Sequence, residues 1–134
     1  AVTQRKNDTS TWIDQDFIRA YTQLNEFGFA HSFESWQGDT LVGGLYGVSI
    51  GEVFFGESMF SSVANASKAA FIKAIRFLSL YQFKMIDCQV YSDHLRSLGA
   101  IPISRGDFQS ILFRSMNPSP LNGIRWKDLF ADCN

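Results

Sequence analysis

Several features that define common protein classes are scarce or missing in this chain of 134 residues. Two cysteines are too few for a disulfide framework, and the CxxC spacing of a zinc or redox site is absent. Two histidines, His31 and His94, lack a suitable set of partners, so we expect no metal site. No run of about 18 uncharged apolar residues is present, which argues against a membrane span. We therefore expect a cytoplasmic protein with no membrane partner.

Apolar residues are plentiful, by contrast, and make up 46% of the sequence, with 13 phenylalanines among them. This apolar content excludes a disordered chain. The length is typical of one domain and is sufficient for one core. We therefore treat residues 1–134 as a single domain. The polar segment 1–11 and the segment 118–134 are expected to be loosely ordered.

Charges are distributed unevenly along the chain. Residues 7–67 contain one base, Arg19, and eight acids, which gives this stretch a net charge of −7. Residues 68–127 contain nine bases and three acids, which gives a net charge of +6. Such asymmetry is compatible with one polyanionic and one cationic partner. The alternative, which charge alone favours, is that the two halves attract each other across the fold.

Hydrophobic periodicity and turn residues predict the order of the elements. The predicted helices span 14–27, 66–82, 94–98 and 107–116. The predicted strands span 30–36, 40–50, 52–58 and 85–91. Tight turns join the first three strands into an antiparallel meander, and the helical crossover makes strand 85–91 parallel to strand 52–58. Asn65 and Asp93 are the expected N-caps of two helices, and Gly28 and Gly99 the expected stops of two helices.

Strand 85–91 contains the residues that most clearly indicate chemistry. Because side chains alternate along a strand, Asp87 and Gln89 are expected on one face and Cys88 on the other, towards the core. Burying an acid and an amide in an apolar strand is unfavourable unless they are hydrogen-bonded or serve a function. The pair suits a site that holds an amine and a carbonyl. Alternatively, Asp87 pairs with a base of the following helices. The core-facing Cys88 argues against a thiol nucleophile.

A second carboxylate, Glu57, lies among large apolar residues. It is either a functional carboxylate or a strand-end acid that faces solvent. Four apolar residues, Leu45, Phe54, Met59 and Phe71, either line a pocket for a bulky apolar group or belong to an ordinary core.

From Thr11 onward, the chain resembles the bacterial leucyl/phenylalanyl-tRNA–protein transferases. The motifs cover about residues 11–108 in the order of the family, and together they are highly specific. They are Thr11-Trp12-Ile13, Ala30-His31-Ser32-Phe33-Glu34-Ser35-Trp36, Leu41-Val42-Gly43-Gly44-Leu45-Tyr46-Gly47-Val48, Gly56-Glu57-Ser58-Met59-Phe60-Ser61, Asn65-Ala66-Ser67-Lys68, Ile86-Asp87-Cys88-Gln89-Val90, Asp93-His94, Ser97-Leu98-Gly99-Ala100 and Arg105-Gly106-Asp107-Phe108.

The resemblance implies an α+β, GNAT-like acyltransferase domain, with a mixed sheet, an antiparallel meander and flanking helices. It implies transfer of Leu or Phe from aminoacyl-tRNA to the N-terminal Arg or Lys of a protein, which marks that protein for degradation through the N-end rule pathway. The reaction needs neither metal nor CoA, so no cofactor is expected. The segment 60–65 also lacks the glycine-rich pyrophosphate-binding loop of acetyl-CoA users.

The resemblance also assigns roles to individual residues. Asp87, with Gln89, would orient and activate the incoming α-amine. Glu57 would hold the cationic N-terminal residue or the 3′ adenosine. The implied substrate-binding residues are Leu45, Phe54, Met59 and Phe71 around the Leu or Phe side chain, Trp36 at the adenosine, Lys68 at tRNA phosphates, and Ser58 and Asn65.

Members of the family also carry an N-terminal module, and we expect this module, with the opening strand and helix of the domain, to be absent here. An exposed sheet edge follows, through which a homodimer could form. Two alternatives stay open. One is a truncated, non-catalytic relative that binds a peptide N-terminus or nucleic acid, and the other is a GNAT acyltransferase that uses a different acyl donor.

Overall fold

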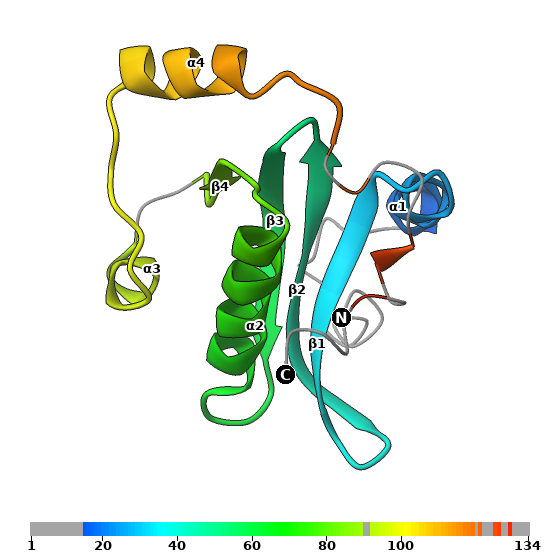
Figure 1. Cartoon of the computed structure of the whole chain (residues 1–134). Helices are drawn as coiled ribbons and strands as arrows, with labels where there is room; N and C mark the ends of the chain where they lie inside the picture. The colour runs from blue at the N-terminus through cyan, green and yellow to red at the C-terminus, as the bar shows by residue number, and fades with distance from the viewer. Residues whose placement is uncertain (1–14, 90–91, 120, 122–124, 127–128, 130–134) are drawn as a thin grey trace.

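The computed structural model of the chain describes residues 15–89, 92–119, 121, 125–126 and 129. The fold is α+β, as the sequence predicts, with one mixed sheet and flanking helices (Figure 1). This arrangement is consistent with the GNAT-like fold that the resemblance implies. The elements in chain order are α1 (Gln15–Glu26), β1 (Ala30–Gln37), β2 (Thr40–Ile50), β3 (Val53–Ser61), α2 (Ala66–Leu80), β4 (Met85–Asp87), α3 (Asp93–Ser97) and α4 (Arg105–Arg114).

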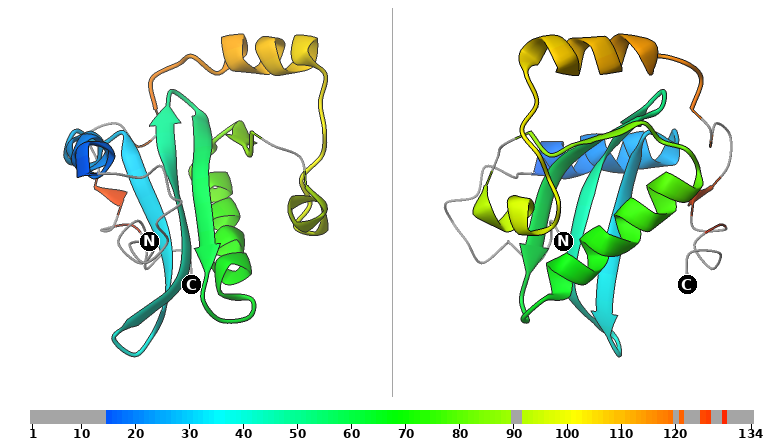
Figure 2. Two further views of the ribbon diagram at one scale, coloured as in Figure 1. Left: turned by 180° about the vertical axis from the view of Figure 1, so that it is seen from behind. Right: turned by 60° about the vertical axis from the view of Figure 1, so that its left-hand side comes forward.

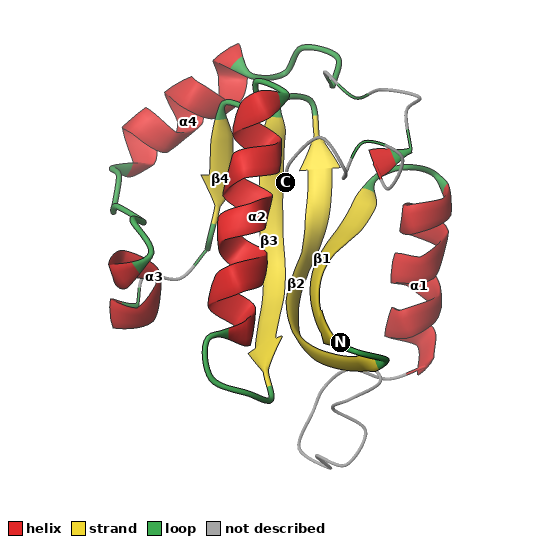
Figure 3. Cartoon of the chain, turned by 60° about the horizontal axis from the view of Figure 1, so that its bottom comes forward, coloured by secondary structure: helices red, strands yellow, loops and turns green. Residues whose placement is uncertain are grey.

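The four strands lie side by side in the order β1-β2-β3-β4. Strands β1, β2 and β3 form the predicted antiparallel meander, and β4 pairs parallel to β3 after the crossover through α2 (Figure 3). The structure therefore confirms both the meander and the parallel crossover. It also places β1 and β4 at opposite edges of the sheet.

Strand β4 is shorter than the predicted strand 85–91, which is a correction. Its pairing with β3 ends at Asp87, and Gln89 has a φ of 62°. The backbone N–H of Gln89 donates to Oδ1 of Asp87 at 2.8 Å and closes a turn. A left-handed residue ends the pleated backbone, so the expected alternation of side chains stops there. Residues 90–91 lie outside the described residues.

The helix caps correct a second expectation. Asn65 occupies the N-cap position of α2, but its φ is 65° and its side chain makes no capping hydrogen bond. At α3 the N-cap is Ser92 rather than Asp93, because the Ser92 side chain accepts from the Leu95 N–H at 3.2 Å. Serine and aspartate cap helices about equally well, so sequence alone does not choose between neighbours. Gly28 and Gly99, with φ of 85° and 98°, follow α1 and α3 as predicted.

Helices α1 and α2 cover opposite faces of the sheet (Figure 2). On the α2 face, Phe33 and Leu45 pack in the core cluster with Phe71 of α2. On the α1 face, the ring of Tyr21 meets the ring of Tyr46 edge-on, with centroids 5.3 Å apart. Leu45 and Tyr46 are neighbours in β2, so alternation along that strand separates the two packing layers.

Aromatic rings form the centre of the core on the α2 face. Phe54 and Phe77 are fully buried, and Trp126 lies against Phe77 with centroids 5.1 Å apart. Trp126 and Leu121 come from the segment 118–134 that was expected to be loosely ordered, yet both are buried. Other positions of that segment, and residues 1–11, lie outside the described residues.

Gly43 allows α2 to approach the sheet closely. A Cβ atom at this position would lie 2.5 Å from the Cβ of Ala66, at the start of the helix. The Ser35 hydroxyl of β1 also donates to the Ala66 carbonyl at 2.8 Å. Glycine within this strand therefore marks a close approach of backbones, as strand glycines often do. None of the helices in the described residues is long and apolar enough to cross a membrane.

The buried Phe77 provides a test of this core. We expect Phe77→Ala to lower the free energy of unfolding by about 3–5 kcal/mol, because it removes a ring that is 0% exposed and leaves a cavity. The matched control is Phe113→Ala on α4, where the ring is 84% exposed and the expected change is below about 0.5 kcal/mol. Urea unfolding followed by circular dichroism measures both changes. Equal effects of the two substitutions would contradict the assigned core.

Candidate functional site

Strands β3 and β4 diverge after Asp87. The register pairs Phe55 with Asp87 and then ends, while β3 continues to Ser61. The chain after β4 turns away through Gln89, so the second half of β3 has no β4 residue opposite it. Asp87, which is half-buried, therefore lies where the two parallel strands diverge. The carboxyl ends of parallel strands are common places for ligands to bind.

Glu57 is the extra residue of a β-bulge in β3. Tyr46 pairs with Ser58 and Gly47 pairs with Gly56, which leaves Glu57 without an opposite residue in β2. Bulges re-aim side chains and are frequent next to active sites. The side chain of Glu57 is exposed and hydrogen-bonds with the Tyr21 hydroxyl of α1. The bulge therefore directs this carboxylate to the α1 face.

Tyr21 interacts with Glu57, and no sequence pattern predicted this contact. Burial raises the pKa of Tyr21 to about 12, and the negative charge of Glu57 adds to the rise. The phenol therefore stays protonated and donates to the carboxylate at neutral pH. In the sequence, Tyr21 counts only as one apolar position of a helix. No local signal links it to Glu57, because the contact joins α1 to a distant strand.

Asp87 lies on the same face as Glu57. Val48 pairs with Phe55, and Phe55 pairs with Asp87, so the three side chains share one face across three strands. This is the face of Tyr46, two residues before Val48 in β2. The structure thus brings the two predicted carboxylates to adjacent strands on the α1 face. Gln89 is exposed and is held to Asp87 by its backbone rather than by strand alternation.

Cys88 packs against the core cluster, as predicted. Burial raises the pKa of its thiol, and the nearby charge of Asp87 adds to this rise. A higher pKa leaves less thiolate at neutral pH, so Cys88 is poorly suited to act as a nucleophile.

The predicted apolar pocket residues lie on the α2 side of the sheet. Leu45, Phe54 and Phe71 are buried in the core cluster, and Met59 is partly buried against it. Phe71 and Ile86 also line a groove of about 910 Å³ between α2, β4 and the α3–α4 segment, and Asp87 and Gln89 line the same groove. The structure therefore brings an apolar surface and the acid–amide pair together.

The remaining predicted residues are Trp36, Ser58, Asn65 and Lys68. Trp36 is in β1, at the opposite edge of the sheet, and its side chain is 55% exposed. Its indole N–H donates to Oε2 of Glu34 at 3.0 Å. Asn65 and Lys68 lie at the start of α2, where both are exposed, and Ser58 follows the bulge. The structure does not place Trp36 at the point where β3 and β4 diverge.

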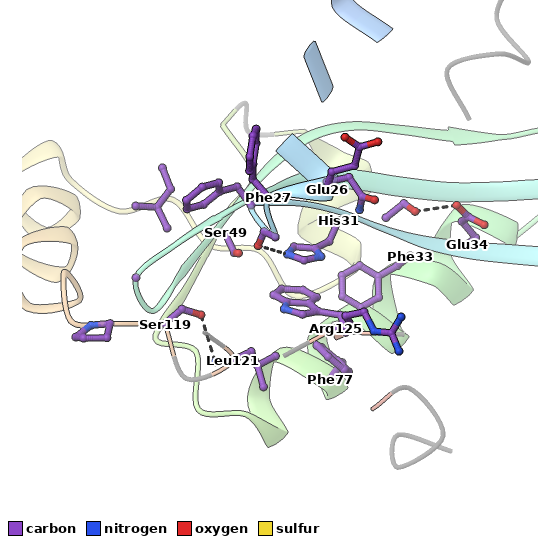
Figure 4. A pocket seen from close by; sticks show the side chains of 18 of the residues that line it. Glu26, Phe27, His31, Phe33, Glu34, Ser49, Phe77, Ser119, Leu121 and Arg125 are labelled. Atoms are coloured by element: carbon purple, nitrogen blue, oxygen red, sulfur yellow. Dashed lines mark hydrogen bonds between the residues drawn. The ribbon is translucent and has the colours of Figure 1, made fainter. Parts of the chain in front are cut away.

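A second groove, of about 1170 Å³, follows β1 along the edge of the sheet (Figure 4). The imidazole of His31 stacks on the indole of Trp126, with centroids 3.6 Å apart and planes within 4°. Burial lowers the pKa of His31, and its Nε2 lies 2.9 Å from the Gly28 carbonyl. Among the described residues, no three His, Cys, Asp or Glu side chains gather to hold a metal.

A carboxylate and an amide at a strand divergence, next to a bulged carboxylate and an apolar groove, can position an amine against a carbonyl. This is the chemistry of an acyl-transfer protein. A sequence model of the family described as leucyl/phenylalanyl-tRNA protein transferase matches residues 1–113. The chain belongs to this family, as its motifs predicted.

Curated relatives named leucyl/phenylalanyl-tRNA–protein transferase have similar sequences. The protein from Cellvibrio japonicus is 57% identical over 119 residues, which cover 89% of this chain and 51% of that relative. The proteins from Anaeromyxobacter sp. and Nitrosospira multiformis are 47% and 53% identical, over 91% and 84% of this chain and 52% and 49% of those relatives. The chain therefore spans about half the length of the curated relatives it matches.

The hydrogen bond between Tyr21 and Glu57 provides a second test. Because its folded-state pKa lies above the usual 10.0, Tyr21 contributes stability that is lost as the pH rises from 10 towards about 12. We expect Glu57→Gln to lower the pKa of Tyr21 but to leave it above 10, since burial is the larger cause. Titration of the tyrosine Cζ resonance by NMR measures the pKa.

The control for this titration is Glu52→Gln. Glu52 lies in the turn between β2 and β3, where its carboxylate accepts from the Asn117 side chain at 3.1 Å. This substitution should leave the Tyr21 titration unchanged. An unchanged titration in Glu57→Gln as well would show that the bulge does not direct the carboxylate towards α1.

Proposed function

We propose that this chain carries the acyl-transfer site of an aminoacyl-tRNA–protein transferase, which moves Leu or Phe to the N-terminal Arg or Lys of a protein. The observation that carries the proposal is the placement of Asp87 at the divergence of β3 and β4, beside the bulged Glu57. Family membership supports the reaction class.

The reaction is the attack of an α-amine on an aminoacyl ester. The amine nitrogen forms a bond to the ester carbonyl carbon, and the bond from that carbon to the ribose oxygen breaks. Asp87 accepts the proton that the amine loses and gives it to the ribose oxygen, which leaves as a hydroxyl group. The side chain of Gln89, next to Asp87, supplies an amide that can orient the amine or the carbonyl.

The apolar side chain of the transferred amino acid requires an adjoining pocket. Phe71 and Ile86 line the groove that Asp87 and Gln89 also line, and Leu45 and Met59 lie in or against the core cluster to which Phe71 belongs. A Leu or Phe side chain that enters there buries its apolar surface while the ester stays near Asp87. Phe54, which is 0% exposed, belongs to the same core cluster.

The exposed charges on the two faces of the sheet suit the two substrates separately. The exposed carboxylate of Glu57 lies on the α1 face, in the acidic part of the chain, and suits the cationic side chain of an acceptor Arg or Lys. Lys68 and Arg76 are exposed on α2, which covers the other face, and suit tRNA phosphates.

Three further assignments belong to this proposal. Trp36, with its half-exposed indole at the β1 edge, suits stacking on an unpaired adenine, and Ser58 and Asn65 supply polar groups to the substrates. Transfer of Leu or Phe marks the acceptor for degradation through the N-end rule pathway. The use of aminoacyl-tRNA places the reaction in the cytoplasm.

A second candidate is a non-catalytic module that binds peptide N-termini, and the exposed Glu57 carboxylate suits a cationic N-terminus without requiring any transfer step. Titration of the chain with an Arg-starting peptide separates the two candidates when it accompanies a transfer assay. Binding without any transfer supports the module. The remaining alternative, a different acyl donor, predicts binding of acetyl-CoA in calorimetry.

The proposed role of Asp87 gives a direct test. We expect Asp87→Ala to reduce transfer of Phe from charged tRNA to an Arg-starting peptide by about 10²–10⁴-fold, because the amine loses its proton acceptor. The control is Asp39→Ala, in the exposed turn between β1 and β2, which should keep the rate of the unmodified chain. A folded Asp87→Ala chain with an unchanged rate excludes the role.

The proposed tRNA contact of Lys68 predicts a change in salt dependence. We expect Lys68→Gln to weaken tRNA binding and to reduce the slope of log K against log salt by about 0.7–0.9, the effect of one lost phosphate contact. Arg19→Gln, on the opposite face of the sheet, should leave the slope unchanged. Filter binding at several salt concentrations measures it, and equal slopes for all three chains would remove Lys68 from the contact.

A further inference from the structure

The groove between α2, β4 and the α3–α4 segment carries a net positive charge. Helices α3 and α4 lie beyond the β4 edge of the sheet, on the far side of β4 from α2 (Figure 3). Of the described residues that line the groove, Lys84 and Arg105 are basic and Asp87 is the single acid. A concave surface with an excess of one charge attracts ligands of the opposite charge. The groove therefore favours an anion next to the proposed site of acyl transfer.

The two cations of this groove, Lys84 and Arg105, form no ion pair with an acid of the described residues. The backbone N–H of Lys84 donates to the Glu52 carbonyl at 2.8 Å, but the Glu52 carboxylate accepts from the Asn117 side chain at 3.1 Å. Asp107 lies two residues after Arg105 in α4, and helical residues at that spacing do not face each other. Both cations are therefore available to a ligand.

Helix α2 extends the basic surface beyond the groove. Its 15 residues include three basic side chains and no acidic one. Lys68, Ile72 and Arg76 follow one another at a spacing of four residues, so they share one face of the helix. Ser79, which lines the groove, lies three residues after Arg76 and is its neighbour on the helix surface. A basic path therefore leads from the start of α2 to the groove.

Lys84 lies close to the carboxylate at which the donor ester would react. It directly precedes β4, and Asp87 ends that strand, so about 10 Å of extended chain separates the two residues. In an aminoacyl-tRNA the ester is on the ribose of the last nucleotide, and the first phosphodiester lies just beyond that ribose. A groove that holds the ester at Asp87 therefore also meets the phosphodiesters of the tRNA end.

Phe108 adds an aromatic ring to the wall that contains Arg105. It follows Arg105 by three residues in α4, so the two side chains share a face of the helix, and both line the groove. The side chain of Phe108 is half-buried, which leaves part of it accessible. Proteins that bind single-stranded nucleic acid combine cations along the phosphate backbone with aromatic rings on which nucleobases stack. Arg105 and Phe108 supply this combination.

We propose that this groove binds the unpaired 3′ end of the donor tRNA. Lys84 and Arg105 contact its last phosphodiesters, Phe108 stacks on a nucleobase, and the basic face of α2 continues the path away from Asp87. The proposal rests on the proposed function, because it places the aminoacyl ester at Asp87. An acidic peptide, the rival occupant, matches the cations but supplies no nucleobase for the ring of Phe108.

A labelled tetranucleotide, the RNA ACCA, tests the groove without any transfer step. Fluorescence anisotropy at several salt concentrations gives the slope of log K against log salt for the full chain. We expect Lys84→Gln and Arg105→Gln each to reduce this slope by about 0.7, the effect of one lost phosphate contact on a single strand. Phe108→Leu should weaken binding about tenfold at an unchanged slope, because it removes stacking but no charge.

The matched control for this titration is Arg114→Gln. Arg114 ends the helix that Arg105 begins, is exposed, and lies outside the residues that line the groove. This substitution should leave both the affinity and the slope unchanged. Circular dichroism of each variant confirms that the chain is folded.

Two donors separate this proposal from the proposed function. Charged tRNA carries phosphodiesters, whereas the phenylalanyl ester of adenosine carries none. We expect Lys84→Gln and Arg105→Gln to raise KM for charged tRNA about threefold to tenfold and to leave kcat and KM for the adenosine ester unchanged. If the unmodified chain transfers Phe from neither donor, the proposed function is wrong, and the tetranucleotide titration alone decides whether the groove binds RNA.

Three results would overturn the proposal. The first is an unchanged slope in both folded groove variants, Lys84→Gln and Arg105→Gln. The second is an equal loss of slope in Arg114→Gln, which assigns the effect to the general surface charge. The third is displacement of the tetranucleotide by hexaglutamate as effectively as by unlabelled ACCA, which assigns the groove to acidic peptides.

Discussion

The bulge in β3 determines which side chains face the core and which face the candidate site. Phe54 and Met59 both pack on the α2 side, although they lie five positions apart and would face opposite sides of a regular strand. The extra residue, Glu57, shifts the alternation and allows both to face inward. The same shift turns Glu57 to the α1 face, so one irregularity serves both the core and the site.

The short pairing of β3 with β4 positions Asp87, the second carboxylate of the candidate site. Only three residues of β4 pair, and the turn at Gln89 leads the chain away from the sheet. Asp87 is thereby fixed by the sheet on one side and by the Gln89 N–H on the other. A longer strand would have closed the opening that the proposed acyl transfer requires.

Much of the architecture could be predicted because it follows from local patterns. Periodicity and turn residues were sufficient for the meander, the crossover and the approximate helices, and the motifs were sufficient for the family. The extent of β4 could not be predicted, because MIDCQVY suits a strand throughout and only the left-handed Gln89 ends it. The core position of Trp126 was also missed, since nothing near it in the sequence indicates which distant surface it covers.

The sequence by itself determined the order of elements, the family and the two candidate carboxylates, because spacing and residue type encode these locally. Tertiary structure alone decided that Tyr21 contacts Glu57 and that Trp36 and Asp87 lie at opposite edges of the sheet. These features depend on strand order and register, which join residues far apart in the chain. Pairing across strands, rather than any local pattern, sets which side chains meet.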